Sequence, residues 1–163
     1  EMQRSLVGSE MCIRDRLQRV KDASVTIDGE VKGKCSNGFL ILLGVKAGDS
    51  EKEADFLAKK IANLRVFTDE NDKMNLSLLD IKGETLVISN FTLYADCSHG
   101  RRPNFLNAEK PDKANALYEY FCDKLHTEGI SVVEKGEFGA DMKVSLLNDG
   151  PVTIILDTEE IMK

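Results

Sequence analysis

The chain has 163 residues, of which 42% are hydrophobic and 31% charged, and its formal net charge is −6. This balance is typical of one soluble globular domain that can bury a sizeable core. The longest apolar run, residues 39–45, is far shorter than the roughly 20 residues that span a membrane. The acidic charge argues against a protein that coats nucleic acid through bulk charge.

The first 16 residues differ in pattern from the rest of the chain. They show neither helical nor strand periodicity, and they lack the apolar core of a signal peptide. Residues 5–16 resemble a translated sequencing-adapter string. We therefore expect a non-native or disordered extension at residues 1–16 and a single domain at residues 17–163. Asp15 and Arg16 stand where a first strand running into residues 17–20 would need apolar side chains.

Three further strands are predicted before the first helix. Residues 23–27 alternate between apolar and polar side chains, and Asp28-Gly29 is a strong hairpin signal that leads into a return strand at residues 30–35. After a turn at Asn37-Gly38, residues 39–45 are apolar on both faces. A run of this kind is typical of a central, buried strand.

Two main helices are predicted. Ser50-Glu51-Lys52-Glu53 matches a capping box, and apolar residues follow at helical spacing as far as Leu64. The second helix begins near Asp112 and ends before Gly129. Further strands are expected at residues 85–88, 130–134, 142–147 and 152–156. Because hairpin-style linkers dominate, we predict an α+β fold with mostly antiparallel sheets.

The cysteines and histidines do not form a metal-binding pattern. No two of the four cysteines are close enough for a CxxC motif, and His99 and His126 are the only histidines. We therefore predict no metal and no other cofactor. Free thiols are typical of a reducing compartment, so a cytoplasmic location is expected.

Polar side chains gather where the strand at residues 85–88 ends. The run Ser89-Asn90-Phe91-Thr92-Leu93 places two hydroxyl groups and an amide at the exit of a buried strand. Buried groups of this kind need hydrogen-bond partners. They either bond to neighbouring backbone in a strand-end turn or form a pocket floor that faces a ligand.

The segment at residues 96–111 has no periodic pattern and is expected to be an ordered surface loop. It contains Arg101, Arg102 and Phe105. Arginine forks suit phosphates and carboxylates, and a phenyl ring can stack on a base. A solvated basic loop that Phe105 anchors would explain the same residues.

A Gly-Pro pair stands directly before the last predicted strand. Pro151 cannot donate to a β ladder, and Gly150 can adopt a positive φ angle. The pair can therefore aim two backbone carbonyl groups in a direction that ordinary strands do not allow, or it can simply start the strand with a turn. Upstream of it, Asp141 is either a general base or a solvent-facing acid.

Together these segments resemble the D-aminoacyl-tRNA deacylase family. The family signatures are similar to residues 89–93, to Gly100 with Arg102, Pro103 and Phe105, and to residues 148–153. Residues 18–20, 23–25 and 42–45 fit as well, so that the resemblance covers about residues 17–157. One motif position departs from the pattern, because Asn90 stands where the family usually has glutamine.

The resemblance implies a barrel-like fold and a cytosolic homodimer. Such a protein hydrolyses the ester between a D-amino acid and the 3′-terminal adenosine of tRNA. Mischarged glycyl-tRNA is expected to be a further substrate. Such a protein has no DNA or membrane partner. The resemblance implies further contacts with tRNA or adenosine at Arg101, Arg102, Phe105 and Met142.

The resemblance also implies the roles of two motifs. Ser89, Asn90, Phe91 and Thr92 carry the catalysis, with backbone N–H groups around Phe91 and Thr92 forming an oxyanion hole. The Gly150-Pro151 peptide is expected to be cis and to direct its carbonyl groups into the partner subunit's pocket, where they exclude an L-side chain.

Thr92 is the nucleophile candidate by residue type, but no base stands beside it in the motif. We therefore expect the ribose 2′-hydroxyl of the substrate to assist hydrolysis while Thr92 orients it. Two other functions fit the residues. The acidic charge and Asn90 suit a non-catalytic tRNA- or RNA-binding module on the same fold, and a hydrolase of small D-amino acid esters is the second.

Overall fold

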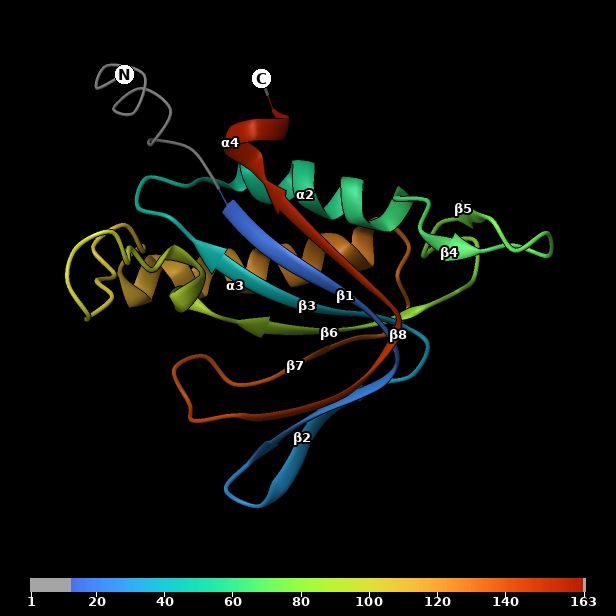
Figure 1. Cartoon of the computed structure of the whole chain (residues 1–163), viewed down its shortest axis with the longest axis horizontal. Helices are drawn as coiled ribbons and strands as arrows, with labels where there is room; N and C mark the ends of the chain where they lie inside the picture. Colours follow the sequence, from blue (N-terminus) through green and yellow to red (C-terminus); the bar gives the residue numbers. More distant parts are fainter. Residues whose placement is uncertain (1–12, 163) are drawn as a thin grey trace.

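The structure is a computed structural model that describes residues 13–162, in which a six-stranded mixed sheet carries two long helices on one face (Figure 1). In chain order the elements are β1 (Ile13–Ile27), β2 (Glu30–Cys35), β3 (Gly38–Val45), α2 (Glu51–Asn63), β4 (Phe67–Thr68), β5 (Met74–Leu76), β6 (Glu84–Ser89), η1 (Phe91–Tyr94), α3 (Pro111–Thr127), β7 (Val133–Lys135), β8 (Lys143–Asp157) and α4 (Thr158–Ile161).

The sheet curls into a nearly closed, barrel-like shape, which confirms the predicted α+β class. Its strand order is β2-β1-β3-β6-β7, and β8 pairs with β1. Most strand pairs are antiparallel, as expected, but β3–β6 and β6–β7 are parallel. The parallel pairs arise because the chain crosses over through α2 and α3 between these strands, and a crossover of this length is what parallel pairing requires.

Strand β3 lies at the centre of the molecule, as its two-sided apolar pattern predicts. Phe39, Ile41 and Leu43 point into a core between the sheet and the two long helices. Leu40 lies in a second core on the opposite face, with Leu42 packed against it. Burial on both faces explains why this strand has no polar side chain.

The two long helices form where capping and periodicity predict them. The Glu53 carboxylate accepts a 2.9 Å hydrogen bond from the N–H of Ser50, which is the predicted capping box at the start of α2. Helix α3 starts at Pro111, and Gly129 follows its end with a φ of 110°. Among the helices of residues 13–162, none is both long and apolar enough to cross a bilayer.

The first strand starts earlier than the expected domain boundary at residue 17. Ile13 pairs with Val45 and Asp15 with Leu43, so residues 13–16 form the beginning of β1. The backbone hydrogen bonds to β3 and β8 hold this end of the strand in the sheet although Asp15 is polar. The rest of the expected extension, residues 1–12, lies outside the described residues.

The last two predicted strands are one continuous strand, so the expected break before Val152 is wrong. In the pairing of β1 with β8, Gln18 faces Thr153 and Val20 faces Asn148. Residues 149–152 therefore lie opposite the single residue Arg19. We call residues 149–152 the β8 bulge. A bulge accommodates a residue without an N–H group inside a strand, which a regular ladder cannot do.

Candidate active site

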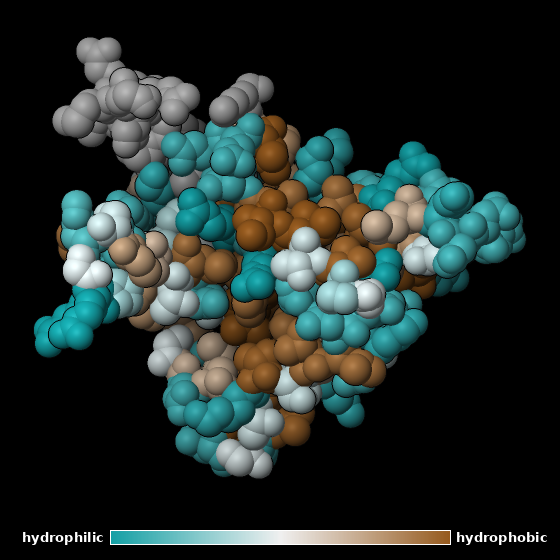
Figure 2. Space-filling model, viewed as in Figure 1, coloured by the Kyte–Doolittle hydropathy of each residue, from teal (hydrophilic) through white to brown (hydrophobic). Residues whose placement is uncertain are grey.

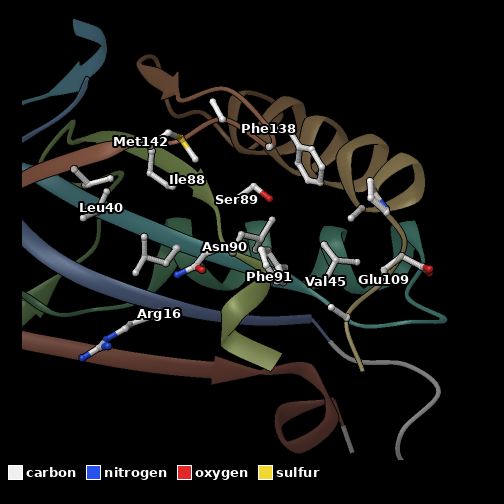
Figure 3. A pocket seen from close by; sticks show the side chains of 18 of the residues that line it. Arg16, Leu40, Val45, Ile88, Ser89, Asn90, Phe91, Glu109, Phe138 and Met142 are labelled. Atoms are coloured by element: carbon white, nitrogen blue, oxygen red, sulfur yellow. The ribbon is translucent and has the colours of Figure 1, made fainter. Parts of the chain in front are cut away.

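A cavity of about 1090 Å³ opens beside the end of β6 (Figure 3). Leu40, Leu42 and Ile88 line the face that the sheet offers to it, and Met142 and Val144 line it from the segment leading into and along β8. Its walls are mainly apolar with a few polar groups, which is the usual chemistry of a small-molecule or nucleoside site.

The polar run after β6 forms the rim of this cavity. Ser89, Asn90 and Phe91 line it, and Figure 3 shows the Ser89 hydroxyl pointing into it. The N–H of Asn90 donates a 2.8 Å hydrogen bond to the carbonyl oxygen of Leu43. This bond fixes the run to β3, so that the short 3₁₀ helix η1 starts at a defined point of the rim.

The Asn90 side chain caps η1 and holds Thr92. Its Oδ1 accepts hydrogen bonds from the N–H of Thr92, at 3.3 Å, and from the Thr92 hydroxyl. Thr92 itself is exposed and lies next to the cavity rather than in its wall. The N–H of Phe91 is the first of η1, where a helix has no acceptor of its own for its N–H groups.

Phe91 and Phe105 form an aromatic pair at the rim. Their ring centroids are 5.0 Å apart with an interplanar angle of 72°, and Phe91 is 54% exposed. An exposed ring held by an edge-to-face contact is a preformed surface on which a base can stack. Both rings line the cavity, so the pair brings together two of the motifs that are separate in the sequence.

One carboxylate of the cavity wall is held ionised by backbone groups. Burial raises the pKa of Glu109, but the N–H groups of Lys110 and Gly48, together with the charges of Lys113 and Lys110, keep that pKa below its usual value. The buried thiols behave in the opposite way. Burial raises the pKa of Cys35 and of Cys122 to about 12, so neither is a nucleophile at neutral pH.

The Gly150–Pro151 pair lies outside the cavity of its own chain. Both residues are exposed, and the peptide bond between them is cis, as expected. Arg19 reaches the bulge from β1, since its Nε donates a 3.0 Å hydrogen bond to the carbonyl oxygen of Asp149. Arg19 also donates to the carbonyl oxygen of Val66 at 2.7 Å.

The structure brings together some of the residues singled out in the sequence. Ser89, Asn90, Phe91, Phe105 and Met142 line the cavity. Arg101 and Arg102 are exposed in the loop that the Asp96–Asn104 bridge closes, and they do not line the cavity. Asp141 is 87% exposed in its side chain and pairs with Lys143 at 3.0 Å, which leaves it solvent-facing rather than poised as a base in the cavity.

Sequence reasoning assigned no site role to several polar residues of the cavity wall, including Glu109 and also Gln18 and Asn148, which it had named only as parts of family-like segments. Gln18 of β1 and Asn148 of β8 both line it and are joined by a 2.6 Å hydrogen bond from Gln18 Nε2 to Asn148 Oδ1. The available signal was their place in two segments that resemble the family, residues 18–20 and 148–153. Within residues 13–162 the acidic, histidine and cysteine side chains form no cluster of three that could hold a metal ion.

Comparison with known proteins identifies this arrangement. Among solved structures, one described as c-Myc DNA Unwinding Element Binding Protein has a TM-score of 0.83 at 39% identity, covering 88% of this chain and 97% of its own. A probable eukaryotic D-amino acid tRNA deacylase shares the fold, with a TM-score of 0.79 at 18% identity over 90% of this chain and 100% of its own. The class is therefore that of the deacylase-like folds.

Sequence comparison narrows the class to a family. A family model described as D-Tyr-tRNA(Tyr) deacylase matches residues 16–157. A D-aminoacyl-tRNA deacylase of Bacillus cytotoxicus is 55% identical over 143 residues, which cover 88% of this chain and 97% of the relative. Another, of Thermosipho melanesiensis, is 52% identical over 149 residues, 91% of this chain and 99% of the relative. The chain belongs to the D-Tyr-tRNA(Tyr) deacylase family.

Proposed function

We propose that this protein hydrolyses the ester bond of D-aminoacyl-tRNA and releases a free D-amino acid and tRNA. Membership of the deacylase family supports the reaction class. The observation that carries the proposal is the rim of the cavity, where Ser89, Asn90 and Phe91 surround a mainly apolar space beside an exposed aromatic pair. The aminoacyl ester lies at this rim, and the terminal adenosine occupies the cavity.

The hydrolytic step uses water and a group of the substrate. Water attacks the ester carbonyl carbon, the bond from that carbon to the ribose oxygen breaks, and the proton lost by the water passes through the ribose 2′-hydroxyl to the departing oxygen. Backbone N–H groups stabilise the negative charge on the carbonyl oxygen. The N–H of Phe91 is the better donor, because the N–H of Thr92 is already bonded to Asn90.

Thr92 orients the substrate rather than attacking it. Its hydroxyl donates to the amide oxygen of Asn90, which is not a base and cannot remove a proton. The shorter amide of Asn90 therefore acts on Thr92 and on η1. A glutamine at this position would carry its amide one methylene further from the backbone.

Selectivity comes from the β8 bulge of a second copy of the chain. In the proposed homodimer the Gly150 and Pro151 carbonyl groups enter the partner's cavity and exclude an L-side chain, while the D-isomer and glycine fit. The exposure of both residues outside their own cavity supports this arrangement. So do the exposed apolar side chains of the same strand, since Leu147 and Ile155 of β8 are 56% and 65% exposed, and Figure 2 shows apolar patches on the face that it displays.

The proposed partner is cytoplasmic aminoacyl-tRNA, bound at its 3′-terminal adenosine, and the proposal includes neither DNA nor a membrane. One assay separates it from its rivals: the protein is incubated with D-Tyr-tRNA, L-Tyr-tRNA and free D-Tyr ester. Release from D-Tyr-tRNA alone supports the proposal. Binding of the tRNA without release indicates a non-catalytic RNA-binding module, and cleavage of the free ester indicates a small-ester hydrolase.

A further inference from the structure

The Gln18 side chain lies between the cavity and the β8 bulge. It is 9% exposed and lines the cavity wall. Its Nε2 donates a 2.6 Å hydrogen bond to Oδ1 of Asn148, the residue that directly precedes the bulge. This bond attaches the residue before the bulge to β1. The next residue of β1, Arg19, attaches Asp149, the first residue of the bulge.

The burial of this amide is not explained by stability. Within residues 13–162 the Oε1 atom of Gln18 is buried and has no hydrogen-bond partner. A buried acceptor without a partner destabilises the fold, and an apolar side chain of similar size would avoid that cost. Positions at which a side chain opposes stability tend to have a functional role.

We infer that Gln18 is a positioning residue for the Gly150–Pro151 pair and acts through Asn148. The bulge has four residues opposite one, so regular ladder hydrogen bonds do not determine its path. Side chains of β1 must hold it instead. Arg19 fixes the carbonyl of Asp149, and Gln18 fixes the residue before it from the cavity side. The positioning role of Gln18 does not depend on the proposed function. Its expected consequence, discrimination between D- and L-aminoacyl groups, does rest on that function.

Two variants test the inference from opposite ends of the hydrogen bond. Gln18→Met keeps the length of the side chain and removes its donor, whereas Asn148→Ala removes the acceptor at an exposed position. In each, the ratio of kcat/KM for D-Tyr-tRNA to that for L-Tyr-tRNA is expected to fall about tenfold, the effect of losing one hydrogen bond. The midpoint of thermal unfolding of Gln18→Met is expected to stay the same or rise.

The double variant shows whether the two residues act together. If Gln18 works through Asn148, Gln18→Met combined with Asn148→Ala reduces the ratio no further than either change alone. If the double variant instead reduces the D-to-L ratio by the product of the two single effects, the inference is overturned. The control is Asn63→Ala, which removes a 2.9 Å amide hydrogen bond to the carbonyl oxygen of Lys59 at the far end of α2 and is expected to leave the ratio unchanged.

Hydrogen exchange tests whether Gln18 and Asn148 hold the β8 bulge without any measurement of activity. Backbone amides of residues 149, 150, 152 and 153 are expected to exchange about tenfold faster in Gln18→Met and Asn148→Ala than in the unaltered protein, while those of β6 keep their rates. Unchanged exchange in both variants would overturn the inference. If the unaltered protein does not hydrolyse D-Tyr-tRNA, the proposed function fails, and the exchange result still decides the positioning role.

Discussion

Arg19 and Asp149 connect the first strand of the sheet to the bulge of the last one. Arg19 Nε donates a 3.0 Å hydrogen bond to the carbonyl oxygen of Asp149 and lies 3.5 Å from its carboxylate. Only 10% of the Arg19 side chain is exposed, and its Nη1 donates to the carbonyl oxygen of Val66. One guanidinium group therefore joins β1, the segment before β4 and the β8 bulge.

Replacing this guanidinium is expected to weaken the bulge and the fold together. Arg19→Lys keeps the positive charge but cannot bond Asp149 and Val66 at once, because an ammonium lacks the planar fork. We expect a loss of about 2 kcal/mol in the free energy of unfolding, measured by urea denaturation, and weaker discrimination between D- and L-Tyr-tRNA. Lys21→Met is the control, since Lys21 is 59% exposed and pairs with the same carboxylate at 3.6 Å. An equal loss in both variants would contradict the expectation.

Gly150 has no room for a side chain. Its φ angle is 126°, and a Cβ atom would lie 3.0 Å from the backbone nitrogen of Val152 and 3.1 Å from Nη2 of Arg19. Gly150→Ala is expected to displace the bulge and to reduce the D-to-L ratio of kcat/KM by tenfold or more, at a cost of about 1–3 kcal/mol in stability. Gly29→Ala separates the cost of a positive φ angle from the displacement of the bulge, because Gly29 has a φ of 79° with nothing within 4 Å of its Cβ position. It is expected to lose stability and keep the ratio.

Asp15 makes the stability of the protein depend on pH. Burial, and then the nearby carboxylate of Asp157, raise the pKa of Asp15 well above its usual value. The stability contributed by a carboxyl group with a raised folded-state pKa is complete below the unfolded pKa and is lost as the pH rises through the folded pKa. The free energy of unfolding should therefore fall as the pH rises above about 4, the usual pKa of an aspartate in the unfolded chain.

Removing this carboxyl group should remove the pH dependence. Asp15→Val is expected to add at least about 2 kcal/mol to the free energy of unfolding at pH 7 and a smaller amount at pH 3.5, measured by urea denaturation at both values. A gain that is the same at both pH values would show that ionisation of Asp15 is not the cause.

Two changes, one in the protein and one in the substrate, test whether the Thr92 hydroxyl or the ribose 2′-hydroxyl takes part in the proton transfer. Because the Thr92 hydroxyl donates to Asn90, Thr92→Ala should retain substantial activity on D-Tyr-tRNA. A D-Tyr-tRNA that ends in 2′-deoxyadenosine should be almost inert. Single-turnover rates measure both effects, and normal turnover of the 2′-deoxy substrate would exclude assistance by the ribose.

Arg101 and Arg102 are expected to bind phosphates outside the cavity. Replacing both by serine should raise KM for D-Tyr-tRNA several-fold and leave kcat unchanged. It should also reduce the slope of log KM against log salt by about 1.4, as two lost contacts to single-stranded phosphates would. An unchanged salt slope would show that the loop is only solvated.

The sequence predicts those parts of the fold that depend on local patterns. The two-sided burial of β3 follows from an apolar run, and the start of α2 follows from Ser50 and Glu53. The continuity of β8 could not be predicted in this way. It depends on how residues 149–152 pair with a strand that lies about 130 residues earlier, and a Gly-Pro pair normally indicates a break.

The parts of the candidate site that sequence motifs define could be predicted. The parts that depend on a contact between distant residues could not. Residues 89–91 line the cavity as their polarity at the end of a buried strand suggests. That Asn90 would cap η1 and hold Thr92 was not predictable, because the same amide could as well face a ligand. Gln18 was given no role for a related reason: Asn148, the partner of its side-chain hydrogen bond, is distant in the sequence.

The pairing of β1 with β8 also determines when the molecule can assemble. Arg14 faces Asp157, and contacts between two strands so distant in sequence form late and slowly. During synthesis the first strand must wait for the last, with one of its edges unpaired until Asp157 has been added. The bulge that carries Gly150 and Pro151 lies in that last strand, so the growing chain forms this bulge at the same step that completes its sheet.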